Sequence, residues 1–215
     1  MYSSVCSSNI LSIDPTLDPA ILNMKIIALT GFMGCGKSSV GRCLSELLCC
    51  PFIDLDEAIC GRAGKSIPEI FASEGETEFR KLEAETLRSI LTPSGTVRTE
   101  KQSLCGQRGS TVSLSLQHRM VIALGGGTVM TPECSEIVKE RSVCIYLKAS
   151  IDTLVRHLET EASGRPMLQG DSLRSRIEEL MNLRSKAYET IAHITIETDG
   201  KSIDAIAEEI VNRLK

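Results

Sequence analysis

The stretch Gly31-Phe32-Met33-Gly34-Cys35-Gly36-Lys37-Ser38 fills the pattern G-x-x-x-x-G-K-[ST] and decides how this chain folds. The residues before it, Lys25 to Thr30, form a short apolar run rich in isoleucine, which predicts a buried strand. The residues after it place apolar side chains at helical spacing: Val40, Leu44, Leu47 and Leu48. A strand, a glycine-rich turn and a helix in this order are the context that confirms a phosphate-binding loop, the P-loop.

The chemistry of this loop follows from its backbone. Glycines let the chain curl so that successive N–H groups converge on phosphate oxygens, and the N-terminus of the following helix adds a favourable dipole. Lys37 can reach the β- and γ-phosphates, and Ser38 can hold Mg²⁺. The loop therefore predicts binding of a nucleoside triphosphate, and the residues that receive the phosphoryl acceptor must lie elsewhere in the chain.

Length and composition fit one globular domain. The chain has 215 residues, of which 42% are hydrophobic and 24% charged. A net charge of −4 and an aromatic content of 3%, with no tryptophan, give no reason to expect a nucleic acid or an anionic membrane as a partner. No apolar run approaches the length of a membrane span. Residues 1–23 are polar and lack the features of a secretory signal, so we expect a disordered extension or an upstream start before Met24.

The nine cysteines do not form a recognisable metal or disulfide pattern. None belongs to a C-x-x-C pair, no histidine lies at ligand spacing, and the count is odd. We therefore expect reduced thiols that pack as small apolar groups, and a cytoplasmic protein. Cys35 is a separate case because it lies inside the P-loop, where alkylation is expected to block nucleotide binding.

Apolar runs alternate with helical patterns along the chain. Strands are expected at 25–30, 51–56, 120–124, 143–147 and 194–196, with helices between and after them, including one over 76–91. Thr131 and Ser202 are predicted to cap the helices that follow them. This alternation predicts an α/β fold, with a parallel sheet covered by helices on both faces. Ligands of such sheets bind at the carboxyl ends of the strands, so the P-loop, the acids after the second strand and the triple glycine after the third are expected to share one cleft.

Asp54 and Asp56 are the first candidates for chemistry beyond the P-loop. If both lie on the second strand, as 51–56 predicts, their side chains leave on the same face. One carboxylate is then available to organise Mg²⁺, and the other to accept a hydrogen bond from a substrate hydroxyl. The alternative is a solvated strand end that caps the next helix.

Three further features have both a functional and an ordinary interpretation. Arg80 and Glu83 share a helix face, which fits either a surface ion pair or an arginine held ready for a substrate carboxylate. Gly125-Gly126-Gly127 fits either a flexible turn or close approach of backbone N–H groups to a ligand. Gly164-Arg165-Pro166 fits either a plain loop or a lid whose arginine closes over the transferring phosphate.

Six motifs in order give these features a common interpretation. The chain resembles the shikimate kinase family from Met24 to Lys215, and the resemblance is carried by GFMGCGKSS at 31–39, FIDLD at 52–56, FRKLE at 79–83, ALGGG at 123–127, GRPML at 164–168 and RSKAYETIA at 184–192. The resemblance implies a P-loop NTPase three-layer sandwich whose five-stranded parallel sheet has the order 2-3-1-4-5, with a lid segment at about 161–171. It also implies a monomer that uses ATP and Mg²⁺ to phosphorylate the 3-hydroxyl of shikimate, on the route to chorismate and the aromatic amino acids.

The family's site residues transfer to this chain motif by motif. The resemblance places Asp56 at the reacting hydroxyl, Asp54 and Ser38 near Mg²⁺, and Arg165 on the phosphates from the lid. It gives ATP contacts to the P-loop and to one arginine of a looser match: Gly34, Cys35, Gly36, Lys37, Ser38, Ser39 and Arg156. It gives the shikimate contacts to two arginines, the acid that orients the first, and the glycine loop: Arg80, Arg184, Glu83, Gly125, Gly126 and Gly127.

The chain departs from the family pattern in two places, and two other functions stay open. Residues 92–118 form an insertion in a connection that is usually short, which we expect to be inert, and residues 1–23 are an extension that the family does not require.

A gluconate kinase is a related alternative, because gluconate is also a polyhydroxylated carboxylate. A family member that has lost catalysis and serves as a binding module is the other, although Lys37, Asp56 and Arg165 are all retained.

Overall fold

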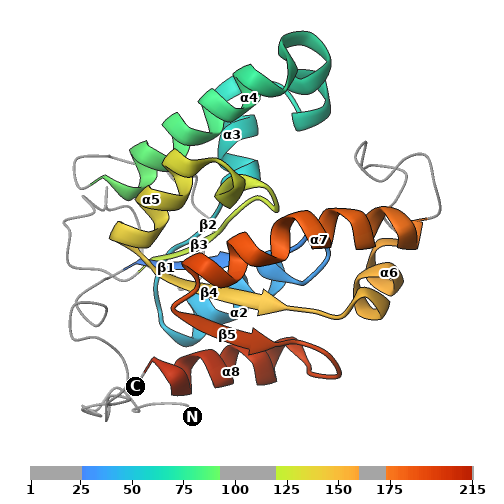
Figure 1. Cartoon of the computed structure of the whole chain (residues 1–215). Helices are drawn as coiled ribbons and strands as arrows, with labels where there is room; N and C mark the ends of the chain where they lie inside the picture. Colours follow the sequence, from blue (N-terminus) through green and yellow to red (C-terminus); the bar gives the residue numbers. More distant parts are fainter. Residues whose placement is uncertain (1–25, 93–119, 160–172, 215) are drawn as a thin grey trace.

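The structure is a computed structural model that describes residues 26–92, 120–159 and 173–214 (Figure 1). Its centre is a sheet of five strands, all parallel, in the order β2-β3-β1-β4-β5. The strands are β1 (Ile26–Thr30), β2 (Phe52–Asp54), β3 (Met120–Ala123), β4 (Val143–Lys148) and β5 (Ile194–Glu197). The predicted fold class and strand order are therefore confirmed.

Helices cover both faces of this sheet, as the alternating pattern predicts. Helices α2 and α8 pack together on one face, and α5 and α7 lie over the other (Figure 1). The helices are α2 (Lys37–Leu47), α3 (Leu55–Ala63), α4 (Ile67–Leu91), the short 3-10 helix η1 (Thr128–Met130), α5 (Pro132–Arg141), α6 (Ile151–Glu159), α7 (Leu173–Ile191) and α8 (Ile203–Arg213).

Burial explains why the central strands are continuous apolar runs whereas the edge strand alternates. β1 and β4 lie between neighbours in the sheet and between helical layers, and nearly all of their residues are buried. β5 stands at the edge, where Ile194 and Ile196 point into the core and the two residues that alternate with them are exposed. The core joins both faces of the sheet, which makes the sheet a rigid platform for the loops at its carboxyl ends.

The second strand is shorter than predicted, and this changes the geometry of the two acids. β2 stops at Asp54, and Asp56 lies in the first turn of α3. The Asp54 carboxylate accepts hydrogen bonds from the backbone N–H groups of Asp56 and Glu57, so it caps the helix and ends the strand. The prediction that both acids alternate along one strand is wrong, and the helix-capping alternative is correct for Asp54.

Helix boundaries agree with the prediction in one place and differ in another. α4 spans Ile67–Leu91, but Gly75 interrupts its helical conformation with φ 80° and ψ 172°, so two helices meet at a kink there. The predicted helix over 76–91 is the second of these two helices. Thr131 precedes Pro132 at the first position of α5 but makes no side-chain cap, whereas Ser202 caps α8 by accepting from Ala205 N–H.

Some predictions fall on residues that the structure does not describe. They are the extension at 1–23, the insertion at 92–118 beyond Thr92, and the lid at 161–171 with Arg165. Within the described ranges, none of the helices is long and apolar enough for a membrane crossing. None of the seven cysteines in those ranges is in a disulfide bond; Cys35, Cys134 and Cys144 are buried, whereas Cys49 is exposed.

Candidate active site

The P-loop takes its shape from glycines in the left-handed region of backbone conformation. Gly34 has φ 80° and Gly36 has φ 92°, and Gly36 is the N-cap residue that precedes α2. A side chain at Gly34 would also collide with Leu158 of α6, since an added Cβ atom would lie 2.8 Å from its Cγ. The loop is thus fixed both by its own sequence and by the helix packed against it.

The polar side chains of the loop are held by short contacts within the described chain. Lys37 Nζ donates to the carbonyl oxygens of Gly31 and Phe32, at 2.9 Å each. Ser38 Oγ donates to Asp54 Oδ2 at 2.6 Å, which brings the end of β2 to the start of α2. The hydroxyl of Ser38 and the carboxylate of Asp54, predicted to hold Mg²⁺ together, therefore lie side by side.

These residues line a cavity of about 790 Å³ at the carboxyl ends of the strands. Its lining contains ten of the predicted site residues: Gly34, Cys35, Gly36, Lys37, Ser38, Ser39, Asp54, Asp56, Gly126 and Arg156. Arg156 reaches it from α6, where its Nη2 donates to Thr153 Oγ1 at 3.2 Å. A volume of this size suits a nucleotide or a nucleotide with a small acceptor.

Cys35 belongs to the P-loop, and its side chain is almost completely buried. Its side chain is 4% exposed, and its Sγ lies 4.0 Å from Lys37 Nζ. Burial raises the pKa of the Cys35 thiol, and the nearby Lys37 charge opposes that rise. This thiol is a packing group in the described structure, so alkylation at Cys35 requires the loop to open first.

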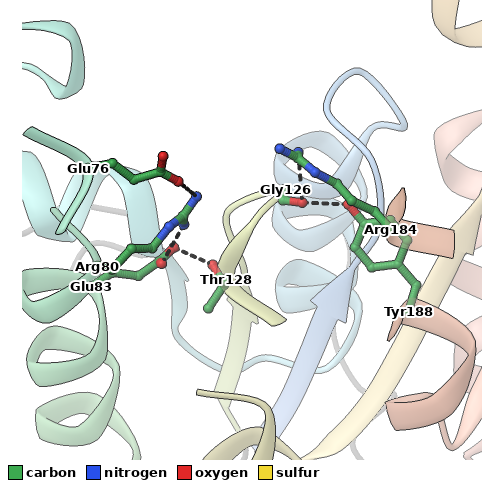
Figure 2. Close-up of polar contacts among 7 residues, drawn as sticks. All are labelled: Glu76, Arg80, Glu83, Gly126, Thr128, Arg184 and Tyr188. Carbon is green, nitrogen blue, oxygen red and sulfur yellow. Dashed lines mark hydrogen bonds and ion pairs between the residues drawn. The ribbon is translucent and has the colours of Figure 1, made fainter. Parts of the chain in front are cut away.

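Arg80 and Glu83 form a largely buried ion pair and not a surface one. Arg80 Nη1 donates to Glu83 Oε2 at 2.7 Å, and Glu83 is only 1% exposed. The other oxygen of Glu83 accepts from Thr128 Oγ1 at 2.7 Å, so the carboxylate is satisfied on both sides (Figure 2). Glu76, one turn earlier on α4, adds a longer bond of 3.3 Å to Arg80 Nη2. These contacts with Glu83 and Glu76 fix the orientation of the Arg80 guanidinium.

The triple glycine is tightly packed and is not a flexible turn. A Cβ atom at Gly125 would lie 2.8 Å from Asp56 Oδ1 and 3.0 Å from Thr128 Oγ1. A Cβ atom at Gly127 would lie 2.9 Å from Arg80 Nη2. Close approach of neighbouring groups therefore explains these glycines, and the loop brings Asp56 and Arg80 to the same short stretch of backbone.

Arg184 reaches this loop from the opposite side. Its Nη1 donates to Gly126 O at 3.4 Å from α7, and its side chain is mostly buried. Figure 2 shows Arg80 and Arg184 on either side of the glycine loop. The cavity lining includes Asp56 and Gly126 but not Arg80 or Arg184, which lie against Gly127 and Gly126 of the glycine loop. The other predicted site residues that the structure describes lie on or against the glycine loop: Gly125, Gly127, Arg80, Glu83 and Arg184.

Two residues near the site were not predicted from the sequence. Tyr188 Oη donates to Gly126 O at 2.5 Å, and it lies one turn after Arg184 on the same face of α7. That spacing was the available signal, inside the quoted RSKAYETIA motif. His157 Nδ1 lies 2.8 Å from Gly34 O and also lines the cavity, but no feature of the sequence distinguishes it.

Comparison with known proteins gives this geometry a family. The family model described as shikimate kinase matches residues 33–99 and 109–215. The chain belongs to the shikimate kinase family. A shikimate kinase of Dictyoglomus turgidum is 37% identical over 194 residues, which cover 88% of this chain and 96% of that protein. The family model leaves only 100–108 between its two matched parts, inside the predicted insertion.

Solved structures agree with the shikimate kinase family at the level of the whole fold. A shikimate kinase from Acinetobacter baumannii in complex with shikimate has a TM-score of 0.73 and 29% identity, covering 89% of this chain and 93% of that one. A gluconokinase from Sinorhizobium meliloti has a TM-score of 0.53 and 15% identity, covering 89% and 92%. The second likeness shows the shared fold alone and does not favour the gluconate alternative.

Proposed function

We propose that this protein transfers the γ-phosphoryl group of ATP to the 3-hydroxyl of shikimate, giving shikimate 3-phosphate and ADP. The observation that supports it most strongly is the position of Arg80 and Arg184 on either side of the glycine loop. This loop adjoins a cavity that the P-loop and Asp56 line. Two arginines and an acid suit a small acceptor that has one carboxylate and several hydroxyls.

The nucleotide side of the cavity supplies charge neutralisation. Backbone N–H groups from Gly34 to Ser38 would surround the phosphates, with Ser39 behind them. Lys37 would exchange its bonds to two loop carbonyls for phosphate oxygens. Arg156 would contact the nucleotide from α6.

Mg²⁺ fits the neighbouring oxygens of Ser38 and Asp54. The ion prefers oxygen ligands and needs few from the protein, and these two groups lie 2.6 Å apart beside the P-loop. When bound with ATP, Mg²⁺ neutralises charge on the phosphates. Asp54 would keep its role as the cap of α3, which holds this carboxylate in place.

The acceptor side positions the hydroxyl and takes its proton. Arg80, oriented by Glu83, and Arg184 would bind the shikimate carboxylate, with backbone groups of 125–127 beside it. The acceptor oxygen forms a bond to the γ-phosphorus as the bond to the β,γ-bridging oxygen breaks, and Asp56 accepts the hydroxyl proton. Arg165 is assigned to the phosphates by sequence resemblance, and that role, the monomeric state and the cytoplasmic location stay predictions.

The test is ADP release by the purified protein with Mg-ATP, compared across shikimate, gluconate and no acceptor. Turnover stimulated only by shikimate supports the proposal. Stimulation by gluconate would assign the acceptor site to another polyhydroxylated acid, and tight ATP binding without acceptor-dependent turnover would support the non-catalytic alternative.

A further inference from the structure

Two tyrosines lie stacked behind the acceptor site, and they differ in one respect. The rings of Tyr146 on β4 and Tyr188 on α7 have centroids 5.3 Å apart and planes inclined by 30°. Both are buried, at 1% and 0% exposure. The Tyr188 hydroxyl donates to Gly126 O at 2.5 Å, whereas the buried Tyr146 hydroxyl has no hydrogen-bond partner among the described residues. The two tyrosines are therefore equally buried, but only the Tyr188 hydroxyl makes a hydrogen bond to the described part of the chain.

The hydrogen bond from Tyr188 fixes the orientation of the whole peptide group between Gly126 and Gly127. The peptide between Gly126 and Gly127 is planar and trans, so the direction of the Gly126 carbonyl also sets the direction of the Gly127 N–H, which points the opposite way. Gly127 in turn lies against the Arg80 guanidinium, which leaves no room for a Cβ atom. A rotation of this peptide would therefore disturb the surface that Arg80 faces.

Tyr188 also connects the loop to the second arginine. Arg184 lies one turn before Tyr188 on α7 and donates to the same Gly126 oxygen, but at 3.4 Å. A bond of that length is weak, so Tyr188 makes the stronger of the two contacts to this carbonyl. The two residues share a helix face and a single acceptor atom, which places them in one unit with the loop (Figure 2).

We infer that Tyr188 is a positioning residue for the acceptor carboxylate, because its hydroxyl fixes the 126–127 peptide between Arg80 and Arg184. The inference rests on the proposed function, since it assigns the carboxylate of shikimate to this loop. Tyr188 acts on acceptor binding and not on the nucleotide, because its contact lies at Gly126 and not at the P-loop. The unpartnered hydroxyl of Tyr146 has no such role.

The test compares Tyr188→Phe with Tyr146→Phe, two variants that each remove one buried hydroxyl and keep the stacked rings. In Tyr188→Phe the KM for shikimate is expected to rise about tenfold, because a buried carbonyl loses its strongest partner. Its KM for ATP and its kcat are expected to stay within about twofold of the wild-type values, because a residue that positions only the acceptor affects neither nucleotide binding nor the chemical step. In Tyr146→Phe all three constants are expected to stay within about twofold, because no bond is lost.

The outcomes separate this inference from the proposed function. Wild-type protein without shikimate-dependent turnover would refute the proposed function itself. Active wild-type protein with equal effects in both variants, or a KM for ATP that rises with that for shikimate in Tyr188→Phe, would overturn the inference and leave a packing role. Thermal unfolding of both variants identifies a loss of fold, and a folded Tyr188→Phe variant with an unchanged KM for shikimate also overturns it.

Discussion

The proposed phosphate-binding and acceptor-binding halves of the site, called here the phosphate half and the acceptor half, are built in different ways. The phosphate half is built around one stretch, residues 31–38, to which Asp54 and Arg156 are added, and the shape of that stretch depends on left-handed glycines and the start of α2. The acceptor half joins three distant segments: Arg80 and Glu83 on α4, the triple glycine after β3, and Arg184 and Tyr188 on α7. Local backbone conformation makes the first, and long-range packing makes the second.

This difference predicts separable functions. Substitutions in the phosphate half are expected to act on turnover, because charge develops there as the phosphoryl group moves. Substitutions in the acceptor half are expected to act on the KM for shikimate, because in the proposed function its groups bind a carboxylate that does not react. Asp56 belongs to both, since it lines the phosphate cavity and lies against Gly125.

The largest effect is expected for Lys37→Ala. Lys37 is the cation of the loop, and its removal leaves charge on the transferring phosphoryl group without its partner. We expect kcat to fall by about 10²- to 10³-fold, the range found when a preorganised electrostatic donor is removed. Steady-state ADP release at saturating shikimate measures this, with thermal unfolding as a check that the variant is folded.

A Lys37→Ala variant with normal kcat would break the comparison, because the phosphate half would then not act on turnover. Lys65→Ala is a suitable control. Lys65 is exposed on the surface in an ion pair with Glu74, far along the chain from the loop, and its loss is expected to leave kcat within about twofold.

Asp56→Asn is expected to lower kcat by about 10²-fold while both substrates still bind. The amide keeps the size of the side chain beside Gly125 but cannot accept the hydroxyl proton. The measurement is kcat with separate KM values for ATP and shikimate. Near-normal turnover would remove Asp56 from proton transfer and leave its part in the cavity as binding alone.

Glu57→Gln is the matched control for this variant. Glu57 lies next to Asp56 in the first turn of α3, but its carboxylate is exposed and pairs with Arg42 at 2.9 Å. An effect on kcat of more than about twofold in the control would mean that charge near the start of α3 matters in general, and that the result for Asp56 is not specific.

The two halves also differed in how far the sequence alone revealed them. The P-loop could be predicted from spacing because its contacts are local, and the alternation of strands and helices led to the correct sheet. The placement of Asp56 on a strand was wrong because the Asp54 side chain ends β2 by capping α3, and a cap competes with a strand over one or two residues.

The acceptor half could not be derived from its residues one by one. From the sequence alone, Arg80 and Glu83 fitted a surface ion pair better than a ligand site, and only the packing of Glu83 against Thr128 in the structure shows that Glu83 is buried. The sequence did not show why three glycines follow β3, because the reason lies in side chains from distant segments that leave no room for a Cβ atom at Gly125 and Gly127. Only the order of six motifs linked these segments before the structure did, and Tyr188 was quoted in one of them without a role.

Arg80→Ala is the next prediction, and it sharpens the acceptor side of the comparison. We expect the KM for shikimate to rise about 10- to 100-fold, because a charge-assisted contact to the carboxylate is lost and Glu83 is left buried without its partner. The KM for ATP is expected to change by less than about twofold. Both constants come from the same assay of ADP release.

Lys81→Ala tests whether loss of any cation from this part of α4 has the same effect. Lys81 follows Arg80 but is exposed and pairs with Glu78 at 2.6 Å, so the KM for shikimate should not change. An unchanged KM for shikimate in Arg80→Ala would place the acceptor carboxylate elsewhere and would contradict the division into two halves.

The smallest effect is expected at Cys35, and it tests whether the phosphate half is a closed, packed unit. Because burial raises the pKa of this thiol, the reactive thiolate is scarce near neutral pH and becomes more abundant as the pH rises towards that pKa. Iodoacetamide is therefore expected to modify exposed Cys49 first and to leave kcat within about twofold, with Cys35 reacting slowly and faster at higher pH. Peptide mass spectrometry over time measures both sites. Rapid labelling of Cys35 at neutral pH would show that the loop opens readily, and its local sequence would then not be enough to hold the phosphate half in shape.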